Sequence, residues 1–265
     1  MIVEVLCIGD ELLTGITLNT NAHWLCSEIT KAGGVVKRVT IVRDDIGEIS
    51  SAIRESLTRN PDILVTTGGL GATYDDMTLE SVAAALNKKV VLDNRAVKML
   101  RKSYAIRNLH YELTKSRLKM ATIPEGSTPI LNPVGSAPAI TERVGGALLF
   151  CLPGVPSEMK EIFGEHILPR VKKGVGKFVA EEIDYNVRGI SEALIAPVLT
   201  EIINSYPKNT IYLKTHPRGY YRGKTPQLRI HLISRGDDKK EVKKRLAGIS
   251  KFIENEIVKL GGTRC

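Results

Sequence analysis

The sequence predicts an α/β protein with a parallel sheet in a large first domain and a smaller α+β domain after it. Three observations lead to this fold class. Strand-like and helix-like patterns alternate over the first 60 residues, a glycine-rich turn at Thr66–Thr78 joins a buried strand to a helix, and the pattern changes after Gly176. A chain of 265 residues is long enough to bury a proper core in this arrangement.

Apolar residues mark the elements of the first domain in order. The predicted strands are Val3–Gly9, Val35–Val42 and Asp62–Val65. Two intervening helices are predicted from apolar residues at helical spacing: Ala22, Leu25, Cys26 and Ile29, then Ile46, Ile49, Ile53 and Leu57. Such alternation is typical of a parallel sheet with right-handed crossovers and helices on both faces. Ligands of these sheets bind beyond the carboxyl ends of the strands.

The turn TTGGLGATYDDMT leaves one such strand end and combines glycines, carboxylates and hydroxyl groups. Glycines let backbone N–H groups approach a phosphate without an intervening Cβ, and a helix N-terminus favours an anion. Two carboxylates beside a phosphate would repel it unless a cation lies between them, so a metal ion is expected. In the alternative interpretation, Asp76 or Thr78 caps the helix and the glycines only turn the chain. The sequence matches neither the dinucleotide fingerprint nor the P-loop pattern.

Two further regions have loop compositions that a simple connector does not need. Gly9–Asn21 carries acidic and amide side chains and also leaves a strand end, although Asn19 or Thr20 capping the next helix would explain part of its polarity. The segments NPVGSAPA (Asn132–Ala139) and LPGVPSEM (Leu152–Met159) flank a predicted strand at Ala147–Cys151. Pro156 suits the first turn of a helix that bears Glu158.

The second domain is predicted from strands at Val179–Val187, Thr210–Thr215 and Leu228–Ile233 and from two helices. The first helix, Ser191–Ile203, would present Leu194, Val198 and Ile202 on one face, and the last helix carries Val242, Leu246, Ile249, Ile253 and Ile257. The hairpin loop Lys214–Lys224 holds Lys214, His216, Arg218, Arg222 and Lys224. This loop either reaches over a bound phosphate or is a basic surface loop without a ligand.

Composition limits the classes of partner. The net charge of +9 is concentrated in basic stretches expected to be helical, Lys98–Lys119 and Asp237–Arg245, while aromatic residues make up only 5% and do not interleave with the basic ones. Nucleic acid is therefore not expected as a partner. Four scattered cysteines, Cys7, Cys26, Cys151 and Cys265, give no zinc or disulfide pattern. The sequence contains no apolar stretch long enough to span a membrane, so a cytoplasmic protein is expected.

Five motifs follow one another over residues 1 to 195: GDELLTG with NTNA, TTGGLGATYDDMT, NPVGSAPA, LPGVPSEM and RGISEA. Together they resemble the competence-damage-inducible CinA family, whose N-terminal part belongs to the molybdopterin-binding (MoCF, MoaB/Mog-like) domain superfamily. The resemblance implies a three-layer α/β/α molybdopterin-binding-like domain over residues 1–173 and a small α+β domain over residues 174–265. It also implies a homo-oligomer and a metal-dependent ADP-ribose pyrophosphatase that uses magnesium or cobalt, with potassium.

The resemblance implies a set of site residues, motif by motif. Asp76, Asp75 and Glu11 are expected to be the catalytic residues and metal ligands. The expected ligand-binding residues are Asn19, Asn21, Thr67, Gly68, Gly69, Gly71, Thr78, Asn132, Gly135, Ser136, Gly154, Pro156 and Glu158. The chain departs from the family in having Ala72 where proline is usual. It also ends at Cys265, before the nicotinamide-mononucleotide deamidase domain of full-length relatives, so no deamidase activity is expected.

The working hypothesis from sequence is hydrolysis of ADP-ribose to AMP and ribose 5-phosphate. Two alternatives use the same glycine loop. One is a molybdopterin-binding or cofactor-assembly protein that holds a pterin phosphate, and the other is a nucleotide-binding protein without turnover. The sequence leaves open the physiological substrate, the metal, the carboxylate that acts as base, the oligomeric state and the role of Lys214–Lys224.

Overall fold

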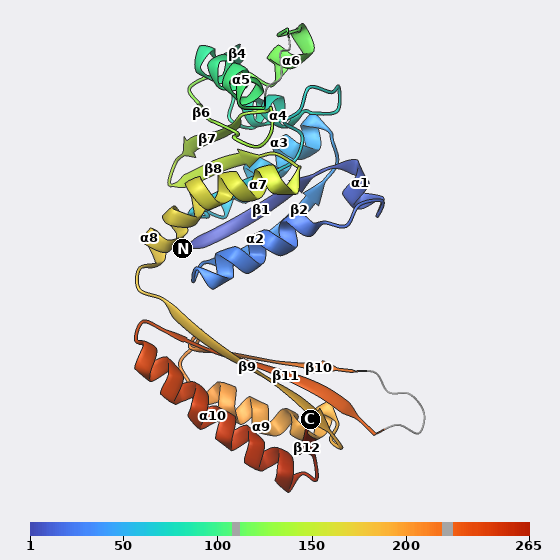
Figure 1. The fold of residues 1–265 in the computed structure, drawn as a ribbon, viewed down its shortest axis with the longest axis vertical. Coiled ribbons are helices and arrows are strands. Elements are labelled where there is room, and N and C mark those ends of the chain that lie inside the picture. The colour runs from blue at the N-terminus through green and yellow to red at the C-terminus, as the bar shows by residue number, and fades with distance from the viewer. Residues whose placement is uncertain (108–111, 219–224) are drawn as a thin grey trace. The chain divides into compact units, whose positions relative to one another are not determined.

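The computed structural model describes residues 1–107, 112–218 and 225–265 (Figure 1). The chain forms two compact units, Met1–Val175 and Gly176–Cys265. The change between them lies close to the boundary of residues 173 and 174 expected from the sequence. Within the described residues, no helix is long and apolar enough to cross a membrane.

The first unit is built on a six-stranded sheet with the strand order β2-β1-β3-β8-β7-β6. Its four neighbouring strands β2, β1, β3 and β8 run parallel, and β7 and β6 add an antiparallel edge. The predicted α/β class with a parallel sheet is therefore confirmed, while the antiparallel edge was not predicted. The strands are β1 (Ile2–Ile8), β2 (Val35–Val42), β3 (Ile63–Thr67), β6 (Thr128–Ile130), β7 (Ala139–Val144) and β8 (Ala147–Leu152).

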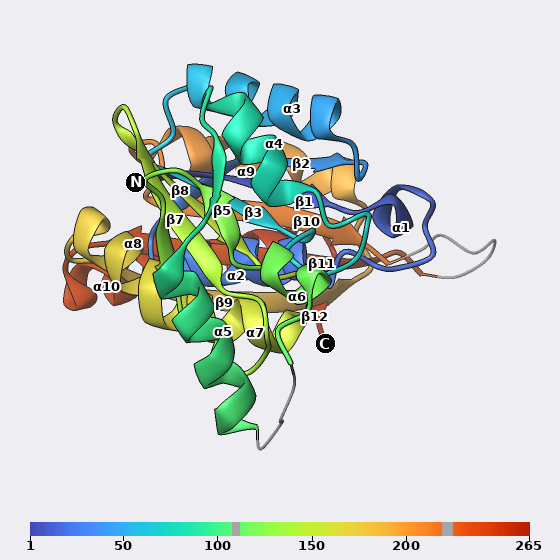
Figure 2. The ribbon, with the colours of Figure 1, turned by 90° about the horizontal axis from the view of Figure 1, so that it is seen from above.

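Helices cover both faces of this sheet, which gives three layers (Figures 1 and 2). Alternate residues of β1 show the reason: Val5 and Cys7 join one buried cluster, and Leu6 and Ile8 join the other. One cluster includes α2 (Thr20–Lys31), α7 (Pro156–Ile162), a π-helical turn (Phe163–Ile167) and α8 (Leu168–Val175). The other includes α3 (Ile46–Thr58), α4 (Thr78–Ala85) and α5 (Asn94–Ile106).

Shorter elements complete the first unit and correct two expectations. The predicted loop Gly9–Asn21 contains a short helix, α1 (Asp10–Leu13). The basic stretch Lys98–Lys119 is not one helix, because α5 ends at Ile106 and Thr114 starts a new helix by accepting a hydrogen bond from Arg117 N at 3.4 Å. The remaining elements are α6 (Lys115–Lys119) and a two-stranded antiparallel sheet of β4 (Val90–Leu92) and β5 (Thr122–Pro124).

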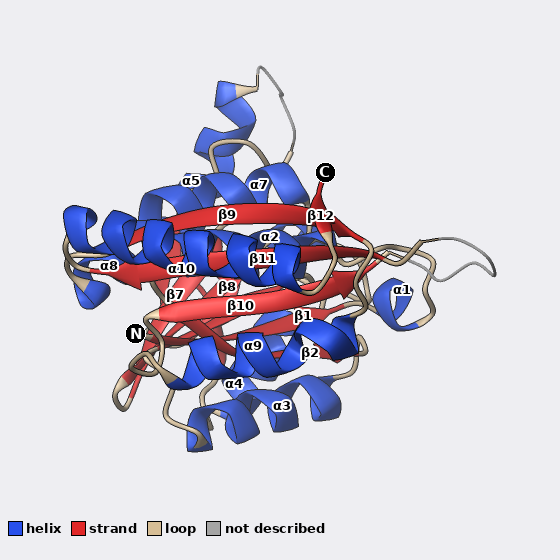
Figure 3. Ribbon diagram, turned by 90° about the horizontal axis from the view of Figure 1, so that it is seen from below, coloured by secondary structure: helices blue, strands red, loops and turns tan. Residues whose placement is uncertain are grey.

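The second unit is an antiparallel sheet with helices against one face (Figure 3). Its strand order is β10-β11-β9-β12, formed by β9 (Val179–Arg188), β10 (Ile211–Pro217), β11 (Gln227–Gly236) and β12 (Thr263–Arg264). The helices α9 (Glu192–Asn204) and α10 (Lys239–Lys259) share one buried core with the strands. This confirms a small antiparallel α+β domain.

Two expectations for the second unit need correction or fall outside the described residues. Leu194 was expected on the buried face of α9, but 48% of it is exposed. The buried face is Ile195, Leu199 and Ile202, so the apolar stripe lies one residue later around the helix than predicted. In the basic segment, Lys214 and His216 belong to β10 and Arg218 follows it, while Arg222 and Lys224 lie outside the described residues.

Candidate functional site

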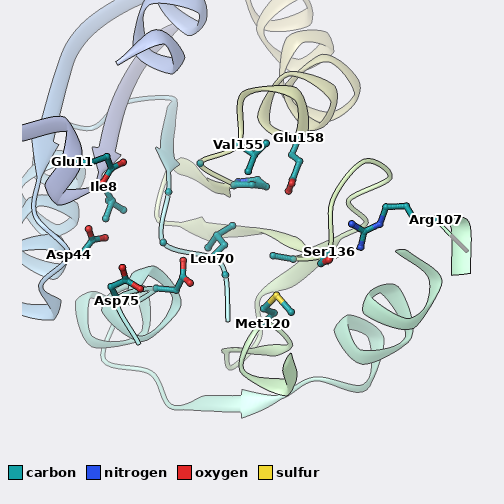
Figure 4. Close-up of a pocket in the computed structure, with 18 residues that line it drawn as sticks. Ile8, Glu11, Asp44, Leu70, Asp75, Arg107, Met120, Ser136, Val155 and Glu158 are labelled. Atoms are coloured by element: carbon teal, nitrogen blue, oxygen red, sulfur yellow. Dashed lines mark hydrogen bonds between the residues drawn. The ribbon is translucent and has the colours of Figure 1, made fainter. Parts of the chain in front are cut away.

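The main cavity of the first unit lies where the parallel strands end. It has a volume of about 440 Å³, within the range usual for small-molecule sites. Figure 4 shows its lining, which comes from β1, the segment after β2, the glycine loop after β3 and the segment after β8. The polar and glycine residues that line it are Gly9, Glu11, Asp44, Gly68, Gly69, Gly71, Asp75, Asp76, Arg107, Ser136, Gly154 and Glu158.

The glycine loop has its shape because side chains would not fit. Gly68 and Gly69 have φ values of +106° and +65°, which L-residues rarely adopt. A Cβ on Gly68 would lie 2.3 Å from the carbonyl oxygen of Ile8, and one on Gly69 would lie 2.3 Å from Thr78 Oγ1. The glycines therefore allow the loop to pack directly against β1 and the start of α4.

Thr78 holds the loop from behind. Its hydroxyl group is buried and donates to the carbonyl of Gly68 at 2.8 Å, and its backbone N–H donates to the carbonyl of Gly69 at 3.1 Å. The N-cap position of α4 is Met77, without a side-chain cap. The alternative in which Asp76 or Thr78 caps the helix is therefore wrong, and both side chains shape the loop instead.

The two aspartates of the loop are fixed by Thr73. Its hydroxyl group lies within hydrogen-bonding distance of both carboxylates, and its backbone N–H donates to Asp76 at 2.8 Å. Lys119 Nζ donates to the carbonyl of Thr73 at 2.7 Å. The hydrogen bond from Thr73 is the main cause that lowers the pKa of Asp75, with a smaller contribution from Lys119. Asp75 is consequently ionised beside the cavity.

The first loop joins the site through its two asparagines. Asn19 caps α2 by accepting a hydrogen bond from Ala22 N at 3.0 Å, so the capping interpretation is correct for this residue. Asn21 Nδ2 donates to the carbonyl of Gly154 at 2.7 Å. Asn21 Oδ1 is buried and has no hydrogen-bond partner among the described residues. Both asparagines line a second, smaller cavity of about 110 Å³ with Thr67, Gly154 and Pro156.

The segment NPVGSAPA places Glu158 in the main cavity. Asn132 is fully buried, and its amide Nδ2 donates to Glu158 Oε2 at 2.6 Å and to the carbonyl of Ala137 at 3.0 Å. Its Oδ1 accepts from Gly135 N at 2.7 Å. A Cβ on Gly135 would lie 2.0 Å from the carboxyl carbon of Glu158. Asn132 and Gly135 thus act from behind the cavity wall and orient Glu158.

The sequence-predicted residues come together around the two cavities. Those that line the main cavity are Glu11, Gly68, Gly69, Gly71, Asp75, Asp76, Ser136, Gly154 and Glu158. Those that line the smaller one include Asn19, Asn21, Thr67 and Pro156. Thr78, Asn132 and Gly135 line neither cavity, because they hold the loops from behind.

Two lining residues were missed. Asp44 follows the second strand, and a carboxylate just past a parallel strand was a signal that could have found it. Its carboxylate accepts from Asp10 N at 2.9 Å. Burial and the charges of Glu11, Asp10 and Asp75 raise the pKa of Asp44. Arg107 follows α5, far in sequence from every motif, and nothing in the sequence pointed to it.

The carboxylates do not form a complete metal site of their own. Among the residues that the structure describes, no three His, Cys, Asp or Glu side chains meet closely enough to hold an ion. The expected set of Asp76, Asp75 and Glu11 is therefore not a preformed three-carboxylate cage. Magnesium is usually held by one or two carboxylates together with substrate phosphates. The donors that line the cavity fit this second, shared type of coordination.

Together these features define a two-unit α/β protein whose first unit holds a glycine loop and carboxylates at the carboxyl edge of its sheet. The family model described as "Probable molybdopterin binding domain" matches residues 4–173. The chain belongs to this family.

Relatives extend the similarity over nearly the whole chain. A protein of Metallosphaera sedula is 39% identical over 260 residues, which cover 98% of this chain and 96% of the relative. A protein of Pyrobaculum aerophilum is 41% identical over 258 residues, covering 97% and 94%. Among solved structures, the protein CinA of unknown function from Thermoplasma acidophilum is 39% identical, with a TM-score of 0.57, covering 66% of this chain and 99% of that one. The chain is thus CinA-like, with a molybdopterin-binding domain.

Proposed function

We propose that the chain is a metal-dependent nucleotide pyrophosphatase that hydrolyses ADP-ribose to AMP and ribose 5-phosphate. One observation carries the proposal: a glycine loop suited to a phosphate and five carboxylates line the same cavity. In the reaction, water attacks one phosphorus atom of the anhydride. The new P–O bond forms with the water oxygen, and the bridging oxygen leaves on the other phosphate.

Each part of the cavity has a task in this reaction. Backbone N–H groups of the glycine loop bind phosphate oxygens at the start of α4. Asp76, with Asp75 or Glu11, holds a divalent cation together with the substrate, and Thr73 keeps the two aspartates in place. When bound, the cation would neutralise phosphate charge and supply an activated water molecule. Potassium is proposed as an additional cation on the basis of the family resemblance.

Product analysis tests the proposal. The purified chain is incubated with ADP-ribose, with magnesium or cobalt and with potassium present or absent, and products are followed by mass spectrometry. We expect AMP and ribose 5-phosphate only when a divalent cation is present. Asp76→Asn retains the acceptor for the Thr73 N–H but loses the charge, so turnover should fall about 100-fold or more. The matched control, Asp237→Asn, changes an exposed aspartate of the second unit.

Two results would reject the proposal. The first is a folded protein that gives neither product with any of these cations. The second is unchanged turnover of Asp76→Asn at saturating metal, which would remove Asp76 from the mechanism.

A second candidate function is favoured by the family match over residues 4–173. In this alternative the same loop holds the phosphate of a pterin, as a molybdopterin-binding or cofactor-assembly protein would, with adenylyl transfer as the related chemistry. Binding of molybdopterin without hydrolysis of ADP-ribose would support it. A nucleotide recovered unaltered from the purified protein would instead favour a nucleotide-binding protein without turnover.

A further inference from the structure

Arg107 projects into the main cavity from the C-terminal end of α5 (Figure 4). Its Nε donates to the carbonyl of Ser103 at 3.1 Å, and its Nη2 donates to Ser136 Oγ at 2.6 Å. The guanidinium carbon lies 5.6 Å from the centre of the Tyr104 ring. These contacts hold the guanidinium group in one position, at the wall of the cavity and beside a serine hydroxyl group.

The charge of Arg107 has no counterpart among the described residues. The ion pairs found in that part of the chain do not include it. The nearby carboxylate of Glu158 is bound by the amide of Asn132 instead. An arginine that faces a cavity without a carboxylate partner is available to bind an anionic ligand.

Charge is distributed unevenly along the cavity. All other ionisable groups that line it in the described residues are carboxylates: Glu11, Asp44, Asp75, Asp76 and Glu158. In Figure 4, Glu11, Asp44 and Asp75 lie on one side, and Arg107 and Ser136 lie on the opposite side. Mutual repulsion at the acidic side is strong enough to contribute to the raised pKa of Asp44. An anionic group of a ligand is therefore repelled at one end of the cavity and attracted at the other.

Ser136 completes the basic end. A hydroxyl group has one proton to donate and can accept two hydrogen bonds. Because Ser136 Oγ accepts from Arg107, its own proton remains free to be donated to a ligand. Arginine donors and a hydroxyl donor in contact with each other match the oxygens of a phosphate group, which accepts several hydrogen bonds at once.

We propose that Arg107 and Ser136 form a phosphate-binding subsite opposite the carboxylates, and that this subsite sets which way the ligand lies in the cavity. The phosphate farther from Glu11 and Asp44 contacts Arg107, while the other end of the ligand faces the carboxylates. This inference rests on the proposed function only in taking a phosphate-bearing ligand for the main cavity. It does not require that the ligand be hydrolysed.

Calorimetric titration of the full chain tests the subsite. The ligands are pyrophosphate, AMP and adenosine in magnesium buffer, and the variants are Arg107→Met, Arg107→Lys and Arg101→Met. Arg101 is an exposed arginine of the same helix and serves as the matched control. For Arg107→Met we expect at least tenfold weaker binding of pyrophosphate and AMP, about 1.4 kcal/mol, with adenosine unchanged. Arg107→Lys should restore part of the loss, because it keeps the charge but not the planar fork.

The outcomes separate this inference from the proposed function. Equal binding of AMP and pyrophosphate by the wild type, Arg107→Met and Arg101→Met would overturn the subsite and leave the pyrophosphatase proposal standing. Weaker phosphate binding by Arg107→Met in a protein that hydrolyses no ADP-ribose would support the subsite and reject the proposed function. If the wild type binds neither pyrophosphate nor AMP, the subsite is wrong. Unfolding temperatures of the variants identify any general loss of structure, in which case Arg107→Lys decides.

Discussion

The two ends of strand β1 treat charge in opposite ways. Near its start, Glu4 is only 2% exposed and forms a two-point ion pair with Arg59 at the end of α3, with N–O distances of 2.9 and 2.7 Å. The hydrogen bond from Arg59 is the main cause that lowers the pKa of Glu4. Beyond its other end, Asp44 lies among carboxylates and its pKa is raised.

This difference distinguishes structural charge from charge available to a ligand. At the start of the strand each charged group has its partner within the chain, so nothing more is needed to stabilise it. At the carboxyl edge, the carboxylates repel one another, Arg107 has no carboxylate partner in the described residues and Asn21 Oδ1 is buried without a hydrogen bond. A bound ligand with its cation would supply the missing partners.

The largest effect is expected at the glycine loop. Gly68→Ala adds a Cβ 2.3 Å from a backbone carbonyl oxygen at a φ of +106°, so we expect a loss of about 3 kcal/mol in the free energy of unfolding and loss of phosphate binding. Gly145→Ala is the matched control, because its φ is +57° and nothing lies within 4 Å. It should cost about 1 kcal/mol. Chemical denaturation measures both values, and equal costs would show that packing does not define the loop.

The next effect concerns the paired end of β1. Glu4→Gln leaves Arg59 without its buried partner and should cost about 3 kcal/mol. Glu55→Gln, which removes the exposed carboxylate that also contacts Arg59, is the control and should cost less than about 1 kcal/mol. Similar unfolding free energies for the two variants would contradict the distinction between the two ends of the strand.

The pH dependence of the same pair gives an independent check. Because the pKa of Glu4 is lower in the folded chain than its ordinary value, its contribution is fully present above the ordinary value. It is lost as the pH falls through the folded pKa. Denaturation measured between neutral and acid pH should therefore show a smaller loss of stability in Glu4→Gln than in the wild type. A parallel decline in both chains would argue against Glu4 as a source of acid sensitivity.

The smallest effect is expected at Asp44. A raised pKa means that the ionised form opposes folding at neutral pH. Asp44→Asn keeps an oxygen that can accept from Asp10 N and removes the repulsion, so stability at neutral pH should stay equal or rise by less than about 1 kcal/mol. Thermal unfolding at neutral and acid pH measures this change, with Asp237→Asn as the control. A clear loss of stability would show that Asp44 is bound by attraction instead.

Much of the fold could be predicted because its elements are long and regularly patterned. The apolar run in β1, the helical spacing in α3 and the change of pattern near Gly176 each correspond to an element or unit of the structure. Short strands such as β4 and β6 have only three residues, too few for a period to be visible. The antiparallel edge depends on how such strands pair, which local sequence does not determine.

The candidate site shows the same limit. Residues that lie in continuous motifs, such as Asp76 and Glu158, were found because a motif predicts a loop at a strand end. Arg107 reaches the cavity only because α5 packs across the sheet and ends beside Ser136. The orientation of Glu158 likewise depends on Asn132, which is 26 residues earlier in the chain. Such contacts are set by tertiary packing and have no local signal.

The central claim is that the carboxyl edge of the sheet in the first unit binds a phosphate on its glycine loop. The most direct measurement is nuclear magnetic resonance of the ¹⁵N-labelled chain during titration with AMP and magnesium. The account predicts saturable shifts in the amide signals of Gly68, Gly69 and Gly71, and their loss in Gly68→Ala. Saturable shifts confined to other parts of the chain, with these three amides unchanged, would contradict it.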